Sequence, residues 1–277
     1  MTERPVGRHL AATLANPRAD RVKQVAALAG RSARRRAGQV LVEGPQAVRE
    51  LVAHRASHVR DVYVLEDALA SRGPLALIAD AALEAGLHVH PVSADVARAL
   101  SADSQGIVAV ASSAAVFSQF PSAPRLVAIL SQVRDPGNAG AAIRVADAAG
   151  ADAVVLAGDS VDPTNPKVVR ATAGSLFHLP VVRAESLADA VTAAREAGLA
   201  ILAADVSGAT ELGSPQGPDL TGPTAWVFGN EAWGLSADEL SLADRVMRIP
   251  IFGRAESLNL GTAAAVCLYA SAWAVRR

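Results

Sequence analysis

The chain has 277 residues, of which 51% are hydrophobic and 19% are charged, which is enough for two domains with cores of their own. No apolar run reaches the roughly 18 residues of a membrane-spanning helix, and the first ten residues lack the apolar centre of a signal peptide. The single cysteine, Cys267, excludes an internal disulfide framework and is typical of a reducing cytoplasm, where we expect this protein.

The formal net charge of −1 is unevenly distributed. Residues 1–36 contain nine Lys and Arg residues and two acids, so this segment carries +7 and the remainder carries −8. A basic segment on a near-neutral protein indicates a polyanionic partner. A solvated helix face would have the same composition, so the charge alone leaves both interpretations open.

The first 117 residues alternate between helical and extended patterns, which predicts a small α/β unit. The predicted helices comprise residues 17–29, 46–53, 80–85 and 93–100. The predicted strands comprise residues 39–42, 59–65, 87–92 and 107–111. Four scattered histidines, His54, His58, His88 and His90, lack the further ligands of a metal site, and we expect no metal.

Residues 118–124 contain two prolines and two serines, which predicts a linker before a second α/β unit over residues 125–277. The predicted strands of this unit comprise residues 125–130, 153–156, 179–182, 200–203, 225–228 and 246–251. Its predicted helices comprise residues 139–150, 167–174, 187–197 and 261–275. Polar residues follow several of these strands, and open α/β sheets build their sites at such carboxyl ends.

Each polar residue in these loops also has a structural interpretation. Asn138 and Asn259 could cap the helices that follow them, and Ser257 could stabilise a turn. Glu231 could be an exposed loop acid. Arg144 lies on an otherwise apolar helix and needs a partner or solvent. The chain has no phosphate-binding GxxxxGK[ST] loop, no GxGxxG after the first strand of either unit and no GxSxG elbow, so a nucleotide hydrolase, a simple dehydrogenase and a serine hydrolase are disfavoured.

Three blocks in order carry a family resemblance: residues 138–144 (NAGAAIR), 228–235 (FGNEAWGL) and 249–260 (IPIFGRAESLNL). Their order and spacing resemble the SpoU (TrmH-type) RNA 2′-O-ribose methyltransferases of the SPOUT class. Residues 38–113 resemble the amino-terminal substrate-binding domain of that family. One departure is Ser131-Gln132, where the family pattern has a pair containing Asp or Asn.

The resemblance implies a carboxyl-terminal SPOUT α/β domain with a deep trefoil knot, and a smaller ribosomal-protein-like α/β domain before it that binds RNA. It implies a homodimer and S-adenosylmethionine as the cofactor. The residues whose positions match the cofactor loops are Ala203, Ala204, Asp205, Phe228, Gly229, Gly234, Ile249, Ile251 and Leu258.

The resemblance also implies catalytic roles. A ribose hydroxyl is a poor nucleophile at neutral pH, so it needs a base or a group that stabilises the developing alkoxide. Arg144 would take this role, Asn138 and Glu231 would position the arginine and the ribose, and Ser257 and Asn259 would complete the polar rim. The residues expected to contact RNA phosphates are Lys167, Arg170, Arg34, Arg35 and Arg36.

The expected reaction is methyl transfer from S-adenosylmethionine to a ribose 2′-hydroxyl of structured RNA, with rRNA favoured over tRNA. A resistance methylase for a ribosome-directed antibiotic belongs to the same subgroup. The alternatives are a tRNA 2′-O-methyltransferase, a base methyltransferase of the same class, and a non-catalytic RNA-binding protein of the same fold. The intact set of five polar residues disfavours the last, because a binding module would not require all of them together.

Overall fold

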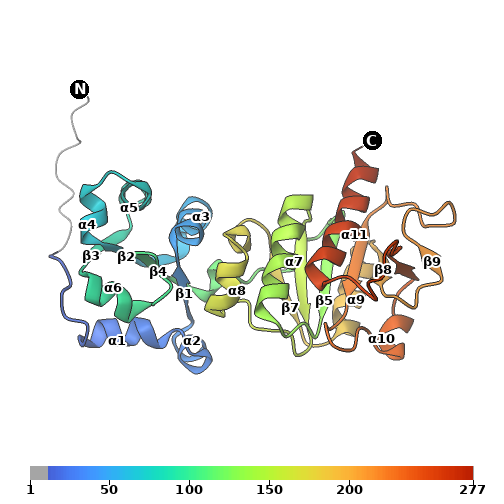
Figure 1. Ribbon diagram of the computed structural model, residues 1–277, viewed down its shortest axis with the longest axis horizontal. Helices are drawn as coiled ribbons and strands as arrows, with labels where there is room; N and C mark the ends of the chain where they lie inside the picture. Colours follow the sequence, from blue (N-terminus) through green and yellow to red (C-terminus); the bar gives the residue numbers. More distant parts are fainter. Residues whose placement is uncertain (1–11, 277) are drawn as a thin grey trace. The chain divides into compact units, whose positions relative to one another are not determined.

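The computed structural model describes residues 12–276, which form two units (Figure 1). The first unit contains the chain up to Ala115 together with Thr164–Arg170, and the second contains Val116–Pro163 and the chain from Ala171 onward. Arg4 and Arg8 of the basic segment lie outside the described residues. Among the described residues, no helix combines the length and the apolar content that crossing a membrane requires.

The first unit is a four-stranded mixed sheet in the order β1-β4-β2-β3. β4 is antiparallel to both β1 and β2, whereas β2 and β3 are parallel. Its strands are β1 (Gln39–Glu43), β2 (Val59–Leu65), β3 (His88–Val92) and β4 (Ile107–Ser112). Its helices are α1 (Asp20–Ala27), α2 (Arg31–Ala37), α3 (Pro45–Arg55), α4 (Glu66–Ala70), α5 (Pro74–Glu84) and α6 (Ala94–Leu100), with most of α8 (Pro166–Ala171) added from the later chain.

The apolar periodicity of α1 explains the core of this unit. Val22, Val25 and Leu28 are buried and pack with α6 over Tyr63 and Val110 of the sheet. The predicted cap of α6 is confirmed, because the amide of Val96 donates to Ser93 Oγ over 3.3 Å. The sequence analysis missed α4, the first six residues of α5 and the helical form of the basic run, which is α2.

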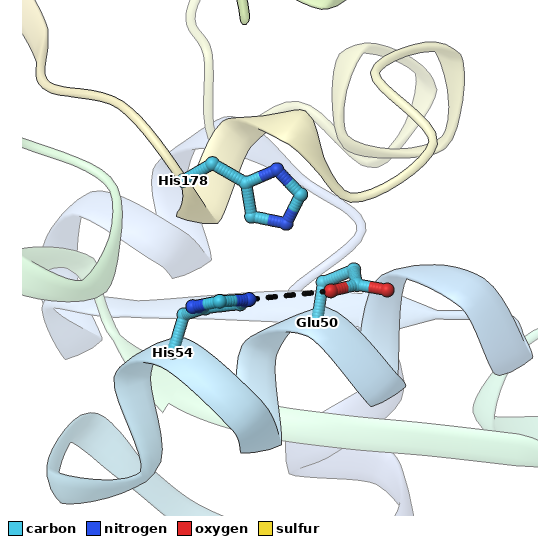
Figure 2. A group of neighbouring side chains, drawn as sticks. All are labelled: Glu50, His54 and His178. Atoms are coloured by element: carbon cyan, nitrogen blue, oxygen red, sulfur yellow. Dashed lines mark ion pairs between the residues drawn. The ribbon is translucent and has the colours of Figure 1, made fainter.

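Two of the four scattered histidines form ion pairs within this unit. On α3, His54 Nε2 lies 3.4 Å from Glu50 Oε2, and Figure 2 shows both side chains along the same helix. His90 Nε2 lies 2.9 Å from Asp61 Oδ1, across the parallel strands β2 and β3. The His54 pair has helical i, i+4 spacing, and its exposed histidine limits its contribution to a few tenths of a kcal/mol at most.

The second unit is a seven-stranded sheet in the order β7-β6-β5-β10-β8-β11-β9, and its strand pairs are parallel. The strands are β5 (Leu126–Ser131), β6 (Ala153–Ala157), β7 (Val181–Ala184), β8 (Ala200–Ala204), β9 (Thr210–Glu211), β10 (Thr224–Phe228) and β11 (Arg245–Arg248). The helices of this unit are α7 (Pro136–Ala149), α9 (Leu187–Glu196), α10 (Ala237–Ser241) and α11 (Leu260–Val275). The expected two-part α/β architecture is therefore confirmed.

Both faces of this sheet are covered, which is why its central strands read as continuous apolar runs. α9 packs through Leu187 and Val191 against one face. α7 and α11 lie side by side on the other face (Figure 1), where Trp226 Nε1 of β10 donates to Ser271 Oγ of α11 over 2.9 Å. Because the strands are parallel, the carboxyl ends of β5, β8, β10 and β11 meet at one edge of the sheet.

Two segments of this unit differ from the predicted elements. The strand expected over 246–251 ends at Arg248, because Pro250 lacks an amide hydrogen and disfavours continued strand pairing. Ile249 and Ile251 therefore lie in a loop. Within the segment predicted as a linker, the amide of Ser118 donates to the carbonyl of Val181 and Phe120 packs under α9.

Candidate active site

A cavity of about 780 Å³ opens at the carboxyl edge of the second sheet, and we call it the carboxyl-edge cavity. Its lining comes from the loops after β8, β10 and β11 and from the first turns of α7 and α11. The predicted site residues that line it are Asn138, Glu231, Ser257 and Asn259, together with Ala204, Asp205, Phe228, Gly229, Gly234, Ile249, Ile251 and Leu258. The fold thus brings together residues that are more than 100 positions apart in the chain.

A chain of side-chain hydrogen bonds connects three of these loops. Asn138 Nδ2 donates to Glu231 Oε1 over 3.1 Å, and Asn259 Nδ2 donates to Asn138 Oδ1 over 2.7 Å. Asn259 Oδ1 in turn accepts from the amide of Gly261 over 2.9 Å. Each asparagine therefore uses its Nδ2 as a donor and its Oδ1 as an acceptor. The Glu231 carboxylate is held through Oε1, and its Oε2 takes no part in these bonds.

The capping interpretation is wrong for Asn138 and confirmed for Asn259. α7 is capped by Asp135, whose Oδ1 accepts from the amide of Asn138 over 2.7 Å, and Pro136 occupies the first helical position. The Asn138 side chain is therefore released from capping and bonds Glu231. Asn259 caps α11 and bonds Asn138 at once. Ser257 is exposed in the lining and makes no hydrogen bond within residues 12–276.

Asn230 is a buried residue of the site that the sequence analysis did not single out. Its side chain is 6% exposed, its Nδ2 donates to the carbonyl of Gln132 over 2.6 Å, and its Oδ1 accepts from the amide of Ala232 over 2.8 Å. Gln132 has a φ of +53°, so this contact stabilises a turn that a non-glycine residue adopts only at a cost. The available signal was its place between Gly229 and Glu231, directly after a buried strand.

The floor of the cavity is built from backbone. A Cβ on Gly229 would lie 2.4 Å from the carbonyl carbon of Gly234, so no larger residue fits there. Gly234 has a φ of +68°, and a Cβ on it would lie 3.2 Å from Asp205 Oδ2. Beside this floor Phe228, Ile249 and Leu258 supply apolar walls. Apolar walls, exposed backbone and the two carboxylates of Asp205 and Glu231 fit a ligand that has a flat ring and polar ends, such as S-adenosylmethionine.

Two predicted site residues do not line this cavity. Ala203 is fully buried among the residues under α9. Arg144 lies six residues after Asn138 on α7, is exposed, and makes no hydrogen bond or ion pair within the described part of the chain. Its exposure answers the question of how an apolar helix accommodates an arginine, because the guanidinium remains in solvent.

The predicted RNA-binding residues divide into two groups. Arg34 is buried, and its guanidinium donates to Thr164 Oγ1 and to the carbonyls of Leu28 and Ala29, so it is committed to structure. Arg170 forms ion pairs with Glu43 and Asp103, which neutralise its charge. The remaining three, Lys167, Arg35 and Arg36, are exposed.

One carboxylate braces the rim of the site. Burial opposes the ionisation of Glu239, but hydrogen bonds from Ser131 Oγ and from the amide and hydroxyl of Ser236 hold its pKa below the ordinary value. The Ser131 bond joins the end of β5 to α10, whose neighbouring Leu240 lines the cavity. Ser131 thus has a structural role at the position where the sequence departs from the family pattern.

Two family models match this chain, one over each unit. Residues 125–269 match the model of the SpoU rRNA Methylase family, and residues 19–109 match the MRM3-like substrate binding domain. An uncharacterised tRNA/rRNA methyltransferase of Synechocystis is 31% identical over 90% of this chain and 89% of its own length. The 23S rRNA (guanosine-2′-O-)-methyltransferase RlmB of Bordetella pertussis is 32% identical over 84% of this chain and 96% of its own.

Solved structures extend the likeness to more than nine-tenths of the chain. The crystal structure of an RNA 2′-O ribose methyltransferase superposes with a TM-score of 0.79 at 28% identity, covering 96% of this chain and 99% of that one. The SpoU methyltransferase AviRb from Streptomyces viridochromogenes, in complex with AdoMet, superposes with a TM-score of 0.76 at 31% identity, covering 92% of this chain and 98% of that one.

Proposed function

This chain belongs to the SpoU rRNA methylase family and is an S-adenosylmethionine-dependent RNA 2′-O-methyltransferase, and we propose that it methylates ribosomal RNA at the carboxyl-edge cavity. The observation that carries the proposal is the hydrogen-bond chain Glu231–Asn138–Asn259, which fixes a carboxylate at the rim of a cavity suited to the cofactor. The names of relatives such as RlmB support rRNA as the substrate.

The cofactor supplies an electrophilic methyl group, and the residues of the cavity hold and orient the reactants. The backbone floor at Gly229 and Gly234 and the walls Phe228, Ile249 and Leu258 would hold S-adenosylmethionine. Glu231, with Oε1 engaged by Asn138, would present Oε2 to the ribose. Positioning of this kind lowers the barrier by several kcal/mol, because the hydroxyl and the methyl group must meet in line.

Arg144 is assigned the stabilisation of the developing alkoxide. Because it lies outside the cavity of its own chain, we place it in the cavity of a second copy, within a homodimer. Exposed apolar residues support such a dimer: Phe252 is 97% exposed and Trp273 is 59% exposed, and with Val266 they line an apolar hollow beside α11. A second copy would cover this surface, since large exposed apolar patches mark interaction sites.

The expected trefoil knot and the RNA contacts belong to the same proposal. The family match supports a knot in which residues 249–260, directly before and at the start of α11, thread through the preceding loops. Trp233 is 52% exposed at the rim of the cavity, where its indole offers an unpaired base a surface for stacking. Lys167 and Arg35 remain exposed candidates for phosphate contacts.

The proposal is tested by transfer of labelled methyl from S-adenosylmethionine to total RNA of a host that lacks this protein. We expect label in the rRNA fraction, at one position that becomes resistant to alkaline cleavage, because a methylated 2′-oxygen cannot attack the adjacent phosphate. Label confined to tRNA would reassign the substrate. Label that leaves alkaline cleavage unchanged would indicate methylation of a base, and no label despite cofactor binding would favour the non-catalytic alternative.

A further inference from the structure

The first unit contains a pocket of about 420 Å³ between α1, α2 and the sheet, which we call the arginine pocket. Its volume lies within the roughly 300–1,000 Å³ range of small-molecule sites. Its apolar floor consists of Val25, Leu28, Tyr63 and Val110. Its polar lining includes Arg21, Arg36, Arg60, Asp61, Gln24 and Gln39.

One arginine of the pocket, Arg21, is held in a fixed position by hydrogen bonds to neighbouring residues of the sheet. Arg21 Nη2 lies 2.7 Å from Asp61 Oδ1, and Arg21 Nε donates to the hydroxyl of Tyr63 over 2.9 Å. His90 Nε2 lies within 2.9 Å of the same Asp61 oxygen and 2.7 Å from Arg21 Nη2. This network fixes the guanidinium in advance, so a ligand need not order it on binding.

The charges of the pocket do not balance. The lining contains three guanidiniums, of Arg21, Arg36 and Arg60, and one carboxylate, Asp61. Arg21 and Arg60 share this carboxylate, since Arg60 Nε lies 3.6 Å from Asp61 Oδ2. Arg36 is exposed and makes no ion pair within residues 12–276. The surplus favours an anion, and guanidinium groups match the oxygens of a phosphate. A simple anion would not need the apolar floor or the two glutamine amides, so these features favour a ligand that also has an apolar ring with hydrogen-bonding groups.

We propose that the arginine pocket binds one unpaired nucleotide of the RNA substrate. Arg36 and Arg60 contact its phosphate, and its base lies on the apolar floor within reach of Gln24 and Gln39. This inference rests on the proposed function for the identity of the RNA, and it adds a second contact point outside the carboxyl-edge cavity. The pocket also distinguishes the arginines of α2, since Arg36 lines it, whereas Arg31 and Arg35 are also exposed but do not line it.

The test compares single substitutions in the full chain at residues that line the pocket with one at a residue that does not. Arg36→Ala and Arg60→Ala remove a phosphate contact, and Gln24→Trp fills the pocket without changing charge. Arg31→Ala is the matched control, because Arg31 is exposed on the same helix and does not line the pocket. Binding to an unmodified 23S rRNA transcript is measured by filter retention at several KCl concentrations. Methyl transfer and cofactor binding are measured on the same preparations.

Each arginine variant of the pocket is expected to raise Kd by about fivefold or more and to lower the slope of log Kd against log salt by about 1. Gln24→Trp raises Kd without changing the slope, and kcat at saturating RNA stays at the wild-type value. An Arg31→Ala effect as large as that of Arg36→Ala, or a Gln24→Trp variant that binds normally, would overturn the pocket. Wild-type protein that binds the transcript without methylating any RNA would instead contradict the proposed function.

Discussion

The two cavities of this protein use charge in opposite ways. The carboxyl-edge cavity is lined by two carboxylates, Asp205 and Glu231, and the hydrogen bonds that hold Glu231 run through two asparagine side chains above a backbone floor. The arginine pocket has three guanidiniums and one buried carboxylate. Neutral donors and close backbone give shape selection, whereas unbalanced charge gives attraction to a polyanion. The difference supports our proposal that one unit binds the cofactor and the reacting nucleotide, and that the other holds the RNA.

The largest expected effect comes from substitutions of the residues proposed to act in catalysis at the carboxyl-edge cavity. Arg144→Ala and Asn138→Ala should each lower kcat by about 10²–10³, because each removes a group that stabilises or orients the reacting oxygen. Arg144→Ala should keep its affinity for S-adenosylmethionine, since the residues proposed to hold the cofactor, such as Phe228, Gly229 and Leu258, are unchanged. Single-turnover methyl transfer and equilibrium cofactor binding measure the two effects separately. Full activity of Arg144→Ala would remove the role assigned to it.

Mixed dimers decide where Arg144 acts. When the two variants are co-expressed with different tags and the mixed dimer is purified, the Asn138→Ala chain supplies Arg144 to the intact cavity of the other chain. We expect up to half of the wild-type activity in this mixture. An inactive mixed dimer would mean that Arg144 serves the cavity of its own chain.

The sequence suggested residues for the catalytic side, but it did not show how they are held. The three motif blocks identified Asn138, Glu231 and Asn259, but only the fold shows that a single chain of hydrogen bonds joins them. The cap of α7 was available from the sequence, because Asp135 directly precedes Pro136 and proline favours the first helical position. The end of β11 was likewise signalled by Pro250.

The basic side could not be resolved from sequence, since consecutive arginines differ only in the direction that a helix gives them. Arg34 faces inward and bonds two carbonyls, whereas Arg35 and Arg36 face solvent and only Arg36 lines the pocket. Successive helical residues point about 100° apart, so a three-residue run must spread over several faces. A helix as short as α2 contains too few apolar residues to show a periodicity, so the sequence does not reveal which of its faces is buried.

The next effect concerns the backbone floor. Gly229→Ala should lower cofactor affinity by about 100-fold or more and lower the free energy of unfolding by about 1–3 kcal/mol, because its Cβ would overlap Gly234. Gly222→Ala is the matched control, since a Cβ there meets nothing within 4 Å and its φ is not positive. Isothermal titration and thermal unfolding measure both quantities. Equal behaviour of the two variants would mean that the floor is not closely packed.

Salt sharpens the contrast between the cavities. Two phosphate contacts in the arginine pocket predict about a tenfold loss of RNA affinity between 50 and 200 mM KCl, through release of counterions. The affinity for S-adenosylmethionine should change by less than about twofold over the same range, because the cofactor is a small molecule without the condensed counterions of RNA. Parallel titrations at four salt concentrations give both slopes. A cofactor slope as steep as the RNA slope would contradict the division of roles.

The smallest effect lies in how each unit stabilises a carboxylate. Hydrogen bonds from Ser131 and Ser236 hold the pKa of Glu239 below its ordinary value despite burial, so its contribution to stability is present above the unfolded pKa, about 4.3, and is lost as pH falls through the lower folded pKa. Glu239→Gln should therefore flatten the acid limb of unfolding free energy below about pH 5 and cost about 1 kcal/mol or less at pH 7, because glutamine still serves a capping box. Asp238→Asn, on the same first turn with no side-chain hydrogen bond in the described residues, should leave that limb unchanged.

Salt separates this carboxylate from the one in the first unit. Because the donors to Glu239 are neutral, added KCl should leave the stability difference between wild type and Glu239→Gln intact. The Arg21–Asp61 ion pair of the first unit, in which Arg21 is half exposed, should weaken under the same salt.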